Sequence, residues 1–87
     1  MAVKNHISLV GNASGVAQST EINAKSISWI SNDGANDITF NFEEGVTTSG
    51  AFKVPAGAVV DDIGSVGTIY YIATGGDTAF SLVGIAR

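Results

Sequence analysis

Apolar and polar residues alternate along much of this chain with the period of two that is typical of β-strands. In DITFNFE (37–43), Ile38, Phe40 and Phe42 fall on one face, which predicts a half-buried strand. SISWIS (26–31) is less regular, because Ile27 and Trp29 share a face while Ile30 falls on the other. The other candidate strands are HISLV (6–10), AFKV (51–54), TIYYIAT (68–74) and TAFSLVGIA (78–86).

Residues that favour turns separate these strands at intervals of about ten residues, as in antiparallel sandwiches and small barrels. NDGAND (32–37) predicts a strand–turn–strand unit, and TGGD (74–77) predicts a hairpin between the last two strands. No window has the 3.6-residue periodicity of an amphipathic helix, so a βαβ arrangement is disfavoured. The predicted fold class is all-β: a single antiparallel β-sandwich, jelly-roll or Ig-like, with short strands and no substantial helix.

With 87 residues, the chain has room for one domain, and it contains no cysteine for disulfides. A domain of this size has a thin margin of stability, which association with other subunits commonly supplements. Residues 1–24 are rich in Ala, Ser, Asn and Gly and predict an N-terminal strand or an extended arm that reaches a neighbouring subunit. Residues 25–87 predict the β-sandwich core.

The charge distribution disfavours some classes of partner. Four basic residues face eight acidic ones, for a net charge of −4, and the basic residues are scattered singly. Nucleic acids and anionic membrane surfaces require clustered cations, so neither is an expected partner. The first 15 residues are too polar for the apolar core of a signal peptide, which favours synthesis in a cytoplasm.

Four aspartates are candidate metal ligands. Asp33 and Asp37 lie in NDGAND, and Asp61 and Asp62 lie in VVDDIGSVG. A calcium site requires six to eight closely spaced oxygens, and the spacing here does not match an EF-hand loop. Asn, Asp and Gly are also the residues that form turns. The turn interpretation is therefore favoured, and no metal or cofactor is expected.

Nothing in the chain has the pattern of a catalytic site. His6 is the sole histidine, and no G-x-S-x-G segment is present. Two carboxylates for a glycosidase-type pair could be chosen from Glu21, Glu43 and Glu44. Any acidic protein offers such a choice, so it does not indicate catalysis. A small sandwich also has little room for an enclosed pocket. We therefore expect a protein that is not an enzyme.

The aromatic residues are candidates for the core, for a subunit interface or for a ligand platform. Trp29 alternates in phase with Ile27, which predicts a core position. Tyr70 and Tyr71 are consecutive, so one must face away from the other. Tyrosine is favoured at interfaces, since its ring is apolar and its hydroxyl can form hydrogen bonds. The residues expected to contact a partner are Ile7, Leu9, Phe52, Tyr70 and Tyr71.

The segment TSGAFKVPAGAVVDDIGSVGTIYYIATGGDTAFSLVGIAR resembles the C-terminal half of small β-sandwich virion proteins of tailed bacteriophages. The likeness lies in an aromatic–apolar strand, a Pro/Ala–Gly turn and a closing hairpin, here 69–84, with SISWISNDGANDITFNFEE before them. It implies a structural protein of the virion, made in the host cytoplasm: a capsid decoration (cement) protein or a tail-type component. Such proteins commonly form trimers that bind the major capsid protein or other virion proteins. The alternative is a small carbohydrate- or receptor-binding module of a tail fibre or adhesin.

Overall fold

A computed structural model describes residues 6–87 of the chain, and within them it contains six strands and no helix. The strands are β1 (His6–Ala13), β2 (Gln18–Asn32), β3 (Ile38–Asn41), β4 (Phe52–Val54), β5 (Val59–Ala73) and β6 (Thr78–Ala86). They form one antiparallel sheet in the order β1-β6-β2-β5-β3-β4. No helix in this described part is long and apolar enough to cross a membrane.

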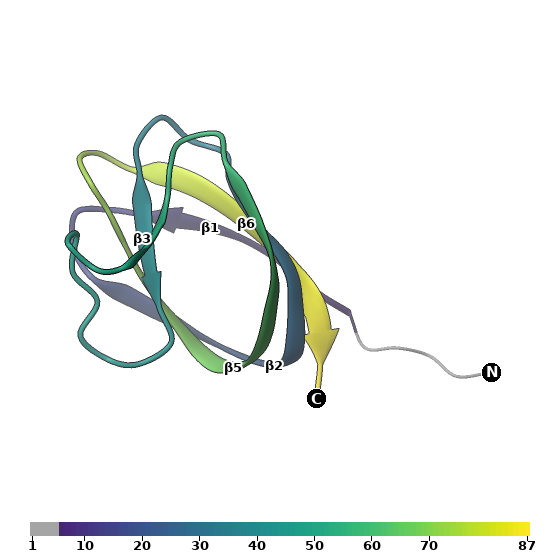
Figure 1. Ribbon diagram of the computed structural model, residues 1–87. Helices are drawn as coiled ribbons and strands as arrows, with labels where there is room; N and C mark the ends of the chain where they lie inside the picture. The colour runs from purple at the N-terminus through teal and green to yellow at the C-terminus, as the bar shows by residue number, and fades with distance from the viewer. Residues whose placement is uncertain (1–5) are drawn as a thin grey trace.

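The single sheet folds over on itself and so makes two layers. The long strands β2 and β5 have 15 residues each, and they curve between the layers (Figure 1). The second half of β2 pairs with β6, whereas its first half pairs only with β5. The first layer therefore contains β1, β6 and one half of each long strand. The second layer contains β3, β4 and the other halves.

The bend of the long strands occurs at irregular backbone positions. The register between β2 and β5 shifts between Glu21 and Ala24 and again on either side of Ile27. Asn23 and Gly64 have positive φ angles of 47° and 81°. Glycine and asparagine adopt this left-handed conformation more readily than other residues. β-Bulges of this kind bend a strand and increase its twist, which allows the two layers to be one continuous sheet.

The connections 14–17, 33–37, 55–58 and 74–77 all pass from one layer to the other. β2 and β3 flank β5, and β5 and β6 flank β2, so neither NDGAND nor TGGD joins paired strands. The hairpin predicted at TGGD is therefore wrong. It is the same hairpin that the resemblance placed within 69–84. Both turns are present, but a turn sequence specifies only a change of direction, and the strands then pair with partners from elsewhere in the chain.

Asn32 holds several of these connections together. Its side-chain amide donates hydrogen bonds to the carbonyl oxygens of Asn36 (2.8 Å) and Val54 (2.9 Å), and its Oδ1 accepts from the Gly34 N–H (3.1 Å). Its backbone N–H donates to Ala58 O, and its carbonyl accepts from Gly57 N. Asn32 is 1% exposed, and its bond to Val54 O is buried, whereas its bonds to Asn36 O and from Gly34 N are partly buried. NDGAND thus has a structural role at this end of the fold.

The core lies between the layers. Phe40 of β3 meets Phe80 of β6 edge-on across the interior, with ring centroids 5.3 Å apart, although these strands are not neighbours in the sheet. Tyr71 packs on Phe80 at 4.9 Å, and its hydroxyl is 2.9 Å from Thr20 Oγ1. The fold is all-β and antiparallel, which confirms the predicted class. The prediction of short strands is wrong for β2 and β5, which have 15 residues each, and the sequence pattern did not indicate that the sheet is continuous.

Residues 6–24 belong to the same sheet as the rest of the chain. β1 pairs with β6 over its full length, from His6 opposite Ile85 to Ala13 opposite Thr78. The first half of β2 pairs with β5. Residues 6–13 and 18–24 are thus strand residues of this sheet, and an arm that reaches a neighbouring subunit stays a prediction. The remaining part of the predicted arm, residues 1–5, lies outside the described residues.

Candidate functional site

Trp29 lies on the outer surface of the first layer. Ile27 and Ile30 are both buried, at 1% and 0% exposure, whereas Trp29 between them is partly exposed. The register shifts between Ile27 and Trp29 against both neighbouring strands, so a bulge changes the phase of the alternation there. The core position predicted for Trp29 is therefore wrong, because that prediction assumed an unbroken period of two.

Two cross-strand rows surround Trp29 on this surface. One row runs from Ser8 through Val83 and Trp29 to Asp61, and the other from Val10 through Ser81 and Ser31 to Val59. Val10 and Val59 are 79% and 59% exposed. We call the residues of these two rows the Trp29 face, in which apolar side chains lie among hydroxyl and carboxylate groups. They are Ser8, Val10, Trp29, Ser31, Val59, Asp61, Ser81 and Val83.

A shallow hollow of about 390 Å³ lies beside the indole. Its lining residues are Ser28, Trp29, Ser31, Val59 and Asp61. Exposed apolar groups around a large aromatic ring, with polar groups at the margin, are typical of contact surfaces.

Asp33 binds two serine side chains of the Trp29 face. Its Oδ1 accepts a hydrogen bond from Ser31 Oγ (2.7 Å), and its Oδ2 accepts one from Ser81 Oγ (2.8 Å). Bonds to the ionised carboxylate favour that form, so Ser31 first and Ser81 second hold the pKa of Asp33 below its ordinary value. The carboxylate thereby connects β2 to β6 across the surface.

The structure separates the four candidate metal ligands. The oxygens of Asp33 are bonded to serine hydroxyls, and Asp37 Oδ1 lies 3.3 Å from the Ala56 N–H that donates to it. Asp61 and Asp62 are exposed at the start of β5. Within residues 6–87, no group of three or more His, Cys, Asp or Glu side chains is placed to hold a metal ion. Asp33 and Asp37 act as turn residues, whereas the turn interpretation is wrong for Asp61 and Asp62, which lie in strand β5.

The five expected contact residues differ in exposure. Tyr71 is 6% exposed, and its ring is part of the core, so it is not available to a partner. Ile7, Leu9 and Phe52 are partly buried and pack against the core. Tyr70 points away from Tyr71, onto the outer surface of the second layer, where it borders a hollow with Gln18 and Glu44. Of the five, Tyr70 is the one with an outward ring.

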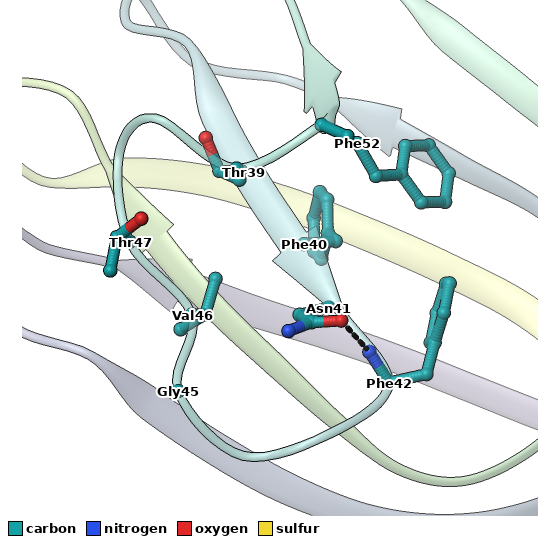
Figure 2. Close-up of a pocket in the computed structure, with 10 residues that line it drawn as sticks. Thr39, Phe40, Asn41, Phe42, Gly45, Val46, Thr47 and Phe52 are labelled. Carbon is teal, nitrogen blue, oxygen red and sulfur yellow. Dashed lines mark hydrogen bonds between the residues drawn. The ribbon is translucent and has the colours of Figure 1, made fainter.

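A smaller pocket of 170 Å³ lies between β3 and the connection 42–51. Figure 2 shows the rings of Phe40, Phe42 and Phe52 together on one side of β3, with Val46 and Thr47 on the other. Thr39 is fully buried here, and its hydroxyl has no hydrogen-bond partner among residues 6–87. A buried hydroxyl without a partner destabilises a fold.

Comparisons of the chain with protein-family models, with curated proteins and with solved structures gave no match.

The sequence prediction missed the Trp29 face, although one signal for it was present. Ile30 falls out of phase with Ile27 in SISWIS, and such a break indicates a bulge when both flanking positions are large and apolar. Val10 and Val59 carried no comparable signal, because an exposed valine and a buried valine are alike in sequence.

Proposed function

We propose that this chain is a non-enzymatic structural protein of a phage particle, a capsid decoration or cement protein, and that the Trp29 face is its contact surface. The observation that carries the proposal is the partly exposed Trp29 on the outer surface, with the exposed Val10 and Val59 in the adjacent row. Tryptophan is the residue type most often found to dominate binding energy at interfaces. The resemblance of 69–84 and the preceding strands to virion proteins supports the same class.

The mechanism is stabilisation by mass action. A protein that binds the assembled shell, and not its free subunits, shifts the equilibrium toward the shell. At a free concentration of about 100 times the dissociation constant, each occupied site adds about 2.7 kcal/mol. The partners are then the major capsid protein or other virion proteins, together with copies of this chain. The location is the virion, after synthesis in the host cytoplasm.

Binding to shells tests the proposal. Shells assembled without this chain are mixed with increasing amounts of the purified protein and sedimented. We expect saturable binding with a fixed number of copies per shell, and a higher temperature of shell dissociation at saturation. Absence of saturable binding to capsids and tails alike would overturn the proposal.

One observation favours a second candidate, a carbohydrate-binding module. The hollow beside Trp29 is lined by Ser28, Ser31 and Asp61, so polar side chains and an indole border the same open depression. Because Trp29 is the sole tryptophan, its fluorescence reports directly on occupancy. A saturable change on titration with an oligosaccharide, and none with shells, would favour this candidate.

A further inference from the structure

The two edges of the sheet are protected very differently. β4 has three residues, carries the exposed Lys53 and is followed by Pro55. Short length, lysine and proline are the features that prevent a strand edge from pairing with another chain. β1 has eight residues and contains no lysine and no proline, and its outer edge pairs with no strand among residues 6–87.

The β1 edge is also uncharged in an acidic protein. The chain has a net charge of −4, yet β1 and β6 together contain no Asp, Glu, Lys or Arg. Asp33 reaches β6 through Ser81, and the hydroxyls of Ser31 and Ser81 satisfy its oxygens. Two acidic copies can therefore meet along β1 with no carboxylate in either of the strands next to the junction.

We propose that β1 pairs antiparallel with β1 of a second copy, about a two-fold axis at Val10. A two-fold contact uses the same surface on both subunits and closes on itself. The pleat permits registers that place residues of the same face opposite one another. In the register centred on Val10, the exposed Val10 side chains of the two copies lie opposite each other. Ser8 of each copy then lies opposite Asn12 of the other, and both of these side chains are also exposed.

This register joins the Trp29 faces of the two copies into one surface. Val10 already belongs to the row that ends at Val59, so the pair makes a row that runs through both subunits. Only the role of this dimer, which is to present two contact surfaces at once, depends on the proposed function. Linked sites bind more tightly than either alone when both can be occupied. The pairing itself is testable without any shell, so the two proposals can fail separately.

Sedimentation equilibrium of the purified chain at micromolar to submillimolar concentrations tests the pairing. We expect a reversible dimer. Val10→Lys places a charge on each side of the axis and should weaken the dimer by about tenfold or more, equivalent to about 1.4 kcal/mol. The matched control is Val59→Lys, the same change at another exposed valine of the same surface, and it should leave the dimer intact.

A cysteine variant tests the register. The chain contains no cysteine, so Val10→Cys introduces a single thiol that a short bismaleimide should cross-link to its counterpart, whereas Val59→Cys should not cross-link. A monomer at every concentration, a trimer as the resemblance implies, or a dimer that Val10→Lys leaves unchanged would each overturn the proposal. Far-UV circular dichroism of each variant verifies that it is folded.

Discussion

Gly84 of β6 lies directly against the carbonyl oxygen of Ser26 in β2, with no room between them for a Cβ atom. Ile27 Cα would lie 3.1 Å from that same Cβ. This contact occurs at the bulge that precedes Trp29, where Ile27 pairs with Gly84 and Trp29 pairs with Val83. A glycine at 84 is therefore a condition for the bulge, and the bulge is the condition for an outward Trp29.

Gly84→Ala should destabilise the protein by about 3 kcal/mol, because backbone atoms on two strands would have to move to admit the methyl group. Urea denaturation followed by circular dichroism measures the change. Gly67→Ala is the control, since a Cβ at Gly67 has no atom within 4 Å. This substitution should change the free energy of unfolding by no more than about 1 kcal/mol. Equal losses in the two variants would contradict a specific role for Gly84.

Asn32→Ala should cost about 3 kcal/mol, since it removes the donor to Asn36 O and Val54 O and leaves the buried Val54 carbonyl without this partner. Thermal unfolding by calorimetry measures the loss. Asn12→Ala changes an exposed asparagine in β1 and should alter stability by less than about 0.5 kcal/mol. A mild effect at Asn32 would mean that water replaces its bonds at this end of the fold.

Thr39→Val should stabilise the protein by about 1 kcal/mol, because the valine keeps the shape and removes a buried hydroxyl that has no partner. The same substitution at Thr20 should have the opposite sign, since it removes the bond to the Tyr71 hydroxyl. Chemical denaturation of the two variants in parallel provides the comparison. A destabilised Thr39→Val variant would show that this hydroxyl is bonded.

The pKa of the Asp33 carboxyl should lie below its ordinary value and should rise when Ser31 and Ser81 are both replaced by alanine. A carboxyl whose pKa is lower in the folded state stabilises that state above the unfolded pKa, and this contribution is lost as the pH falls through the folded pKa. Carbon-detected NMR titration measures the pKa directly. Ser19→Ala, at an exposed serine of β2, is the control and should leave the Asp33 titration unchanged.

The sequence indicated part of each of the six strands, but it missed the first halves of β2 and β5 and did not show which strands pair. Alternation in DITFNFE and TAFSLVGIA is a local property, and it identified β3 and β6. Pairing joins residues far apart in sequence, such as Ile30 of β2 with Leu82 of β6, so the turn at TGGD could not reveal that β2 lies between β5 and β6. The outward Trp29 depends on the bulge between Ile27 and Trp29, and the close contact of Gly84 with Ser26 at that bulge joins two strands far apart in sequence.

The central claim is that the Trp29 face binds the shell. The most direct measurement compares shell binding by Trp29→Ser with binding by Tyr70→Ser, which changes the outward aromatic residue of the other layer. Trp29→Ser should lower affinity by about 30-fold or more, equivalent to about 2 kcal/mol, while Tyr70→Ser should bind as the unmodified protein does. Unchanged binding by a folded Trp29→Ser variant, or a loss confined to Tyr70→Ser, would contradict the account.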